Sequence, residues 1–290
     1  MRLGAVFPQT EIGADPARVR AFAEGVAELG FDHLMAYDHV LGADKDVHTH
    51  LVGPYRAEDM FHEIMVLFGY VAAIVPGLEL VTAVVIAPQR QAALLAKQAA
   101  EIDLLTDGRF RFGLGIGWND VEYEALGMDF SNRGRRFEEQ IELMRLLWTE
   151  PVFDFQGRWH TVTAAGINPL PVQRPIPVWI GGSAERALRR AAVSADGLFP
   201  PRPLEGRDWA GTLEQMRAWA EEAGRDWSRF GIDQRISLAS GGADDWRAVA
   251  EEWVRLGATH LTLVSGGAGF KTPGEHLERL AAGRDALAGF

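Results

Sequence analysis

Short apolar segments typical of buried strands alternate with segments of helical periodicity along the whole chain. The strand candidates cover residues 3–7, 33–37, 79–86, 109–116, 177–181, 197–200, 231–239 and 260–265. Helical patterns follow them at about 16–29, 58–75, 91–105 and 137–148, and then from near 183, 208, 244 and 273. Eight alternating units with no linker between halves predict one (β/α)8 TIM barrel over residues 1–290. A doubly wound sheet is the alternative, although such sheets more often have fewer units.

One segment interrupts this alternation. Residues 152–177 lie between the fourth helix and the fifth strand, and they contain a predicted hairpin around Gln156-Gly157 followed by the proline-rich run NPLPVQRPIP. Insertions on barrels often cover the active site. We therefore expect this insertion near the active-site mouth, where Trp159 and Phe153 would favour a hydrophobic or aromatic substrate.

Composition excludes several classes of partner. The 290 residues carry a net charge of -11 and no cysteine. Such a charge argues against nucleic-acid and anionic-membrane partners, and the absence of cysteine excludes disulfides and thiolate chemistry. The longest apolar run, 64–75, is too short to span a bilayer, and the N-terminus has no signal-peptide pattern. We expect a cytoplasmic protein that acts on a small molecule.

The segment DGRFRFGLGIGW, residues 107–118, has an unusual strand pattern. Bulky apolar residues alternate with Arg111, Gly113, Gly115 and Gly117, so one face is almost bare. Glycines in a strand favour the close approach of a ligand or of another backbone. The segment is therefore either a platform for a planar ligand, ending in Trp118, or a site of tight packing inside a barrel. Its G-x-G-x-G spacing differs from G-x-G-x-x-G, which argues against a nicotinamide-binding Rossmann domain.

Polar residues after the other strands supply candidates for chemistry. Gly181, Gly182 and Ser183 follow a strand and precede a helix, with Ser183 as the cap. They favour a phosphate site at a helix N-terminus, and the alternative is an ordinary β–α turn with a capping serine. Asp38-His39 follows the second strand, and His39 suits either proton transfer or a structural hydrogen bond. Arg90, at the end of the third strand, is a candidate for binding an anion.

These elements together resemble the luciferase-like monooxygenase superfamily, and most closely its deazaflavin (coenzyme F420)-dependent oxidoreductases. The resemblance rests on the order of AELGFDHLMAYDHV, LVTAVVIAPQR, DGRFRFGLGIGWNDVEYEAL and PVWIGGSAERALRRAA, and it covers most of the chain. It implies a barrel with the cofactor ring at the C-terminal mouth and a homodimeric assembly.

The resemblance also implies roles for particular residues. It places catalytic Asp38 and His39 beside the ring, and a bulge with a non-proline cis peptide at Ala83–Val84, after Thr82. The remaining cofactor-binding residues it implies are Gly115, Gly117, Trp118, Gly181, Gly182 and Ser183. The chain departs from the sugar-phosphate dehydrogenases of this family, which have a glutamate at Trp118 and a tryptophan at Ala43, so a glucose-6-phosphate substrate is not expected.

Four functions are compatible with these observations. We expect an F420-dependent oxidoreductase, with no metal. The alternatives are an FMN-dependent monooxygenase that uses dioxygen and a separate flavin reductase, and a non-catalytic cofactor-binding barrel. A metal-dependent hydrolase could also be built on His39, His48 and His50, although His48-Thr49-His50 more simply belongs to a loop.

Overall fold

The central element is a closed barrel of parallel strands. The computed structural model describes residues 1–201 and 207–290. The strands pair in the order β3-β2-β1-β11-β10-β9-β8-β5-β4, and a further β3–β5 pairing closes the ring. The bounds of these strands are β1 Arg2–Val6, β2 His33–Ala36, β3 Glu79–Thr82, β4 Val85–Ile86, β5 Phe110–Gly115, β8 Val178–Gly181, β9 Gly197–Phe199, β10 Gly231–Ser237 and β11 His260–Val264. The predicted TIM barrel is confirmed.

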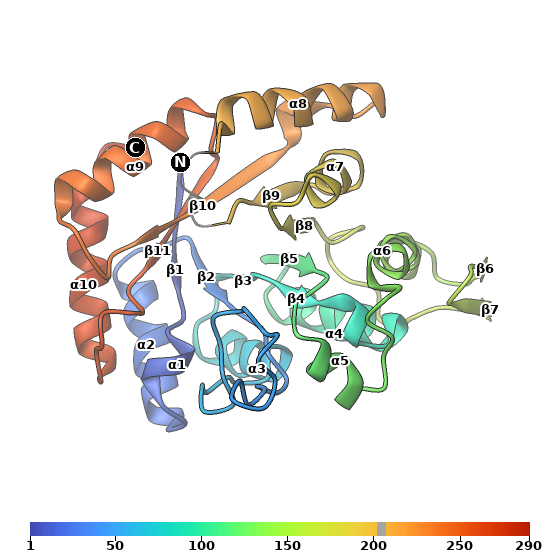
Figure 1. The fold of residues 1–290 in the computed structure, drawn as a ribbon, viewed down its shortest axis with the longest axis horizontal. Helices are drawn as coiled ribbons and strands as arrows, with labels where there is room; N and C mark the ends of the chain where they lie inside the picture. The colour runs from blue at the N-terminus through green and yellow to red at the C-terminus, as the bar shows by residue number, and fades with distance from the viewer. Residues whose placement is uncertain (202–206) are drawn as a thin grey trace.

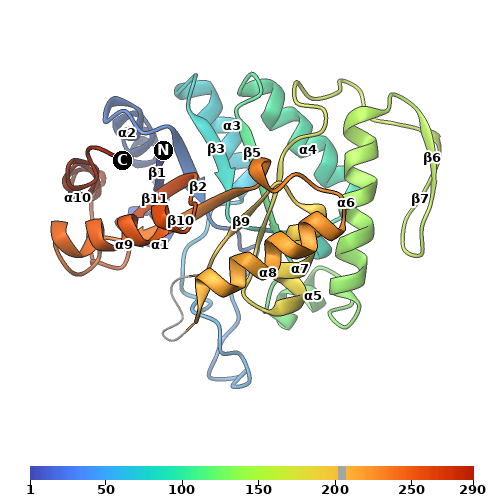
Figure 2. The same cartoon turned by 90° about the horizontal axis from the view of Figure 1, so that it is seen from above.

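Helices surround the barrel (Figures 1 and 2). All eight predicted helical patterns are present, and two short helices, α1 and α5, follow β1 and β5. Their bounds are α1 Gln9–Ile12, α2 Pro16–Glu28, α3 Ile64–Ile74, α4 Ala92–Leu105, α5 Asp120–Ala125, α6 Arg133–Thr149, α7 Glu185–Ser194, α8 Trp209–Glu222, α9 Ala243–Arg255 and α10 Pro273–Ala286, with 3-10 turns η1 Ala87–Gln89 and η2 Trp227–Arg229. None of the helices in the described part of the chain is long and apolar enough to cross a membrane.

The third barrel strand is broken in the middle. The continuous strand expected over 79–86 is two strands, β3 and β4, separated at Ala83–Val84. The peptide bond between these two residues is cis, at the place that the resemblance implied. Both pieces pair with β5, so the break deflects the chain without opening the barrel.

The bare face of β5 is explained by this break. A Cβ atom on Gly113 would lie 1.8 Å from the carbonyl oxygen of Thr82, and one on Gly115 would lie 2.6 Å from Cγ2 of Val84. Gly117 is in the left-handed region, at φ 64°, and faces Ile86. Tight packing against the backbone and side chains of the neighbouring broken strand thus accounts for this row of glycines.

The insertion lies elsewhere than we expected. Its hairpin pairs β6, Phe153–Gln156, with β7, Thr161–Ala165, and in both views it lies outside α6, away from the barrel strands (Figures 1 and 2). Glu139 of α6 accepts hydrogen bonds from the backbone of residues 158–160 at the hairpin tip. The reason is topological, because a segment between a helix and the next strand starts at the N-terminal end of the barrel, opposite the mouth. Trp159 and Phe153 are therefore not mouth residues.

Candidate functional site

The C-terminal ends of the barrel strands, here called the mouth, bring most of the predicted site residues together. The segment between β2 and α3 packs on the segment that follows β5. The His39 ring meets Trp118 edge to face at 5.7 Å, and it meets Tyr55 and Phe61 at 5.0 and 4.9 Å. Gly53 lies against the Trp118 indole, where a Cβ would come within 2.3 Å. His39 and Trp118 therefore form one aromatic wall of the mouth.

The centre of the mouth is the bend at Ala83–Val84. The side chain of Val84 fills the space left by two glycines, because a Cβ on Gly181 would lie 2.9 Å from its Cγ1 and one on Gly115 would lie 2.6 Å from its Cγ2. The hydroxyl of Thr82 donates to the Gly113 carbonyl at 2.8 Å, which ties the start of the bend to β5. Residues from three strands thus shape one surface at the bottom of the mouth.

Asp38 is fully engaged in holding this bend. Its two oxygens accept a pair of hydrogen bonds from Arg90, each 2.8 Å long, and one oxygen also accepts from the Ile86 amide at 3.1 Å. The carboxylate side chain is 1% exposed. Arg90, a candidate for binding an external anion, is therefore paired internally. Asp38 orients the chain after β4 and has little capacity left for proton transfer.

His39 is oriented by a carboxylate that sequence reasoning did not identify. Its Nδ1 faces Oε2 of Glu122 at 3.6 Å, and the Glu122 side chain is 1% exposed. At this distance Nδ1 is not hydrogen-bonded to Glu122, and it is buried without a hydrogen-bond partner in the ranges 1–201 and 207–290. An imidazole with a buried carboxylate beside it suits proton transfer.

Glu122 is also the anchor of the segment above it. Its Oε1 accepts from the amides of Val40 and Leu41 at 2.6 and 3.2 Å, and its Oε2 accepts from Gln89 at 2.8 Å. Burial alone would raise the pKa of Glu122, but the nearby His39 and the hydrogen bonds from Gln89 and the Val40 amide together outweigh burial and lower it. The sequence feature that could have indicated the position of Glu122 is Asn119, whose side chain accepts from the Glu122 amide and caps α5.

The predicted phosphate turn differs in one detail from our expectation. The N-cap of α7 is Ala184 rather than Ser183, and no side chain caps this helix. The amides of Glu185 and Arg186 in the first turn consequently have no intrahelical acceptor. Gly182, at φ 153°, makes the turn from β8 into α7. An uncapped helix N-terminus of this kind suits an anion such as phosphate better than a serine-capped one.

Two polar side chains inside the barrel lie below the mouth without complete hydrogen bonding. Arg235 of β10 donates through Nη2 to the Pro200 carbonyl at 3.0 Å, and its guanidinium lies 5.8 Å from the centre of the Tyr37 ring. The Nε of Arg235 and the hydroxyl of Tyr37 are buried without a partner in the described part of the chain. Both groups can donate to an oxygen of a bound molecule.

The histidines considered for a metal site do not converge. His50 pairs with Asp120 at 3.0 Å, and its ring centre lies 6.1 Å from that of His48. No group of three or more histidine, cysteine, aspartate or glutamate side chains able to hold a metal occurs in residues 1–201 and 207–290. His39 instead belongs to the aromatic wall.

Comparison with known sequences finds relatives over part or nearly all of the chain. An uncharacterized protein of Mycobacterium tuberculosis is 39% identical over 137 residues, which are 47% of this chain and 47% of that protein, so the match spans about half of the relative. A second uncharacterized protein of that organism is 28% identical over 287 residues, covering 97% of this chain and 98% of the other. A pyrimidine monooxygenase of Cronobacter sakazakii is 32% identical over 146 residues, which are 46% of this chain and 41% of that protein.

Solved structures share the fold at low identity. A monooxygenase from Streptomyces bottropensis superposes with a TM-score of 0.80 at 18% identity, over 99% of this chain and 98% of the other. An F420-dependent secondary alcohol dehydrogenase in complex with an F420–acetone adduct superposes with a TM-score of 0.79 at 16% identity, over 99% of this chain and 98% of the other. A riboflavin lyase with modified FMN superposes with a TM-score of 0.69 at 17% identity, over 88% of this chain and 66% of the other. The model of the luciferase-like monooxygenase family matches residues 1–288, and the chain therefore belongs to this family.

Proposed function

We propose that this protein is an oxidoreductase that transfers hydride between a deazaflavin cofactor, coenzyme F420, and a small organic substrate. The observation that carries the proposal is the arrangement of the mouth around the Ala83–Val84 bend. His39 and Trp118 stand on one side of the bend, and the uncapped N-terminus of α7 follows β8 on another. This arrangement fits a flat ring placed over Val84 with its phosphate-bearing tail at Gly181, Gly182 and Ser183.

The residues of the mouth would have separate tasks around such a ring. The deazaflavin supplies a ring carbon that gives or accepts hydride. Asp38 and Arg90 hold the chain that carries Ile86, and Gly117 lets this chain pack closely. Trp118 screens the site from water. Glu122 lies 3.6 Å from Nδ1 of His39, where its charge favours a proton on Nδ1, and His39 would give or take the proton accompanying hydride transfer through Nε2.

The polar groups below the mouth favour a substrate that carries an oxygen. Tyr37 and Arg235 provide unpaired donors on the interior wall, and the wall is otherwise apolar around Val84 and Phe199. An alcohol, a carbonyl or a carboxylate would accept from these donors. We keep the homodimer as a prediction, to be tested by light scattering on the purified protein.

Cofactor binding is the first experiment. The purified chain is titrated with F420 and, in parallel, with FMN, and cofactor fluorescence is followed. We expect micromolar binding of F420 and much weaker binding of FMN. Binding of neither cofactor would contradict the proposal and favour a non-catalytic role.

The role of His39 is tested on the loaded enzyme with an alcohol and ketone panel. His39→Ala should lower kcat by about 10²–10⁴-fold, the range of general acid–base catalysis, while cofactor affinity changes little. Glu122→Gln should reduce kcat less, because it leaves the imidazole in place. Full turnover and an unchanged pH profile in His39→Ala would remove the proton role.

An FMN-dependent monooxygenase is the second candidate, and the structural similarity to a monooxygenase and to a protein with modified FMN favours it. It predicts tight FMN binding together with oxygen consumption when reduced FMN and a substrate are supplied. No oxygen uptake, with F420 turnover present, would exclude this candidate.

A further inference from the structure

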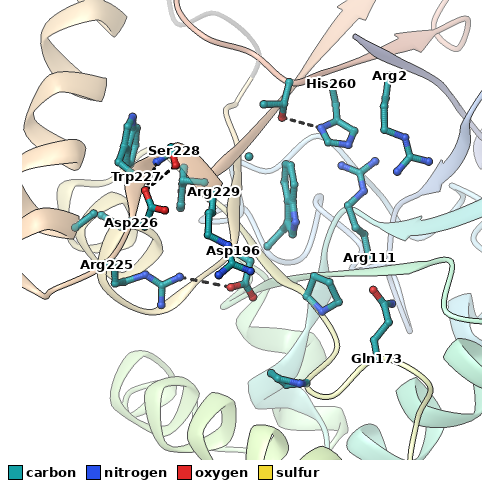
Figure 3. A pocket seen from close by; sticks show the side chains of 18 of the residues that line it. Arg2, Arg111, Gln173, Asp196, Arg225, Asp226, Trp227, Ser228, Arg229 and His260 are labelled. Atoms are coloured by element: carbon teal, nitrogen blue, oxygen red, sulfur yellow. Dashed lines mark hydrogen bonds and ion pairs between the residues drawn. The ribbon is translucent and has the colours of Figure 1, made fainter.

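A cavity lies at the end of the barrel opposite the mouth (Figure 3). Its volume is about 790 Å³, within the range of roughly 300–1,000 Å³ that is usual for small-molecule sites. The starts of the strands form its inner end, and the segment before β10 forms one wall. The proline-rich part of the insertion, through Gln173 to Pro177, forms another wall. The insertion thus encloses a cavity, although at the end of the barrel where we did not expect it.

The lining is rich in arginine in a protein whose net charge is -11. Five arginines face three carboxylates, and these residues are Arg2, Arg111, Arg174, Arg225 and Arg229 against Glu79, Asp196 and Asp226. Neither Arg174 nor Arg229 has a carboxylate within ion-pair distance in the part of the chain that the structure describes. Both are exposed at the rim, where they would attract an anion from solvent.

The carboxylates of the lining are already engaged. Glu79 lies between Arg2 at 3.4 Å and Arg111 at 3.2 Å. Asp196 pairs with Arg225 at 3.4 Å and also accepts from the backbone at the start of β8. Asp226 accepts from the amide and the hydroxyl of Ser228, two residues further along (Figure 3). Glu79 and Asp196 are therefore already paired with arginines, whereas Asp226 keeps its negative charge and interacts weakly with Arg229.

Arg111 offers a fixed donor at the inner end. Its side chain is 5% exposed, it contacts Asp233 through Nη1 at 3.0 Å, and its guanidinium lies 4.7 Å from the centre of the Trp179 ring. Nη2 has no hydrogen-bond partner within residues 1–201 and 207–290. A buried donor left unpaired is unfavourable, and an anionic oxygen from the cavity would satisfy it.

His260 adds no charge to this end of the cavity. Burial, and then the nearby Arg111, lower the pKa of His260 to about 3, so its imidazole is neutral at pH 7. Its Nδ1 is hydrogen-bonded to the Thr259 hydroxyl at 2.8 Å, as Figure 3 shows. The neutral ring leaves the guanidiniums as the cationic groups that a ligand would meet.

We propose that this cavity is a second binding site, and that it takes a small organic anion whose phosphate or carboxylate group binds Arg111. The positive charges of Arg174 and Arg229 guide the anion in, and the apolar part of the ligand lies against the Trp227 indole and the proline-rich wall. The size of the cavity favours an organic anion over a single inorganic ion, which would leave most of it to water. The site does not depend on which cofactor binds at the mouth.

Phenyl phosphate is the probe for a direct test, with inorganic phosphate and the cation benzamidine as comparisons. Titration calorimetry on the full chain at low ionic strength should show saturable binding of phenyl phosphate, weaker binding of phosphate and none of benzamidine. The double variant Arg174→Gln/Arg229→Gln should weaken phenyl phosphate binding about three- to tenfold, since each exposed charge is worth about 0.2–1 kcal/mol. Arg158→Gln, an exposed arginine on the hairpin, is the matched control and should change nothing.

The location of the bound probe is read by NMR, because the α7 N-terminus at the mouth also suits phosphate. Binding at the second site should shift the indole N–H of Trp227 and the amide of Gly231. Shifts confined to Gly182 and Ser183 would place the probe at the mouth and overturn the proposal. An absence of saturable binding, or equal affinity in the double variant, would overturn it as well.

Discussion

The pair between Asp38 and Arg90 gives the sharpest test of how the mouth is held together. In Arg90→Gln, the Asp38 carboxylate would lose both 2.8 Å hydrogen bonds and keep the one from the Ile86 amide. Breaking a buried ion pair by removing one partner costs about 3–5 kcal/mol. The Arg90 side chain is 13% exposed, so water can partly replace it, and we expect a loss of about 3 kcal/mol, near the lower limit.

The assay is thermal unfolding monitored by differential scanning calorimetry. A loss of about 3 kcal/mol corresponds to a Tm lower by roughly 6–9 °C, at about 2–3 °C per kcal/mol for a chain of this size. The double variant Asp38→Asn/Arg90→Gln removes the buried charge as well, and it should recover more than half of this loss. Arg90→Lys can make only one of the two contacts, so its Tm should lie between those of Arg90→Gln and the original protein.

Two results would refute this reasoning. A Tm of Arg90→Gln within about 2 °C of the original protein would mean that the pair contributes less than about 1 kcal/mol. A double variant whose loss of unfolding free energy equals the sum of the losses in Asp38→Asn alone and Arg90→Gln alone would mean that Asp38 and Arg90 are not coupled.

Three further predictions concern packing, pH and the insertion. Gly113→Ala should abolish accumulation of folded protein, because the new methyl group would meet the Thr82 carbonyl. Gly69→Ala, on the open face of α3, should instead add about 0.5–1 kcal/mol to the free energy of unfolding. Equal Tm values for the two variants would contradict this prediction. Glu122→Gln should be less stable than the original protein at pH 7, because the pKa of Glu122 is held below its ordinary 4.5 in the folded state. This stabilisation is lost as the pH falls through the folded-state pKa, so the difference between the urea unfolding midpoints of the two proteins should narrow in acid. A difference that stays constant with pH would count against the hydrogen bonds of the Glu122 carboxylate as its cause. Replacing residues 153–165 by a short turn should leave cofactor affinity in the fluorescence titration unchanged, since the hairpin lies outside α6, and a large loss would place the hairpin at the site after all.

The barrel could be predicted from sequence because its signals are local. Each buried strand is a short apolar run, and each helix has its own apolar stripe. Asp15, a residue type typical of helix N-caps, caps α2, and its side chain accepts from the Ala17 amide. The cis peptide at Ala83–Val84 was expected only through the family resemblance, since no local pattern at these residues indicates it. The cap of α7 was misplaced by one residue, because a glycine turn has no periodicity that fixes where the helix begins.

The rest of the site depends on contacts between distant segments. Glu122 reaches His39 across 83 positions of the chain, and nothing in either local pattern announces that pair. The pairing of Asp38 with Arg90 was hidden in the same way, so each residue looked like an independent candidate for chemistry. The position of the insertion could have been deduced, because its place between a helix and a strand already puts it at the N-terminal end of the barrel.

The glycines of β5 link the evolution of two strands. With any side chain at Gly113 or Gly115, the third strand could not keep its bend, and with a straight third strand the glycines would leave voids in the barrel. Neither partner can change first without loss, so the bend and the glycines should be inherited as a unit. Specificity can then diversify only at positions outside this unit, such as Trp118 and the segment above it, while the base of the mouth stays fixed.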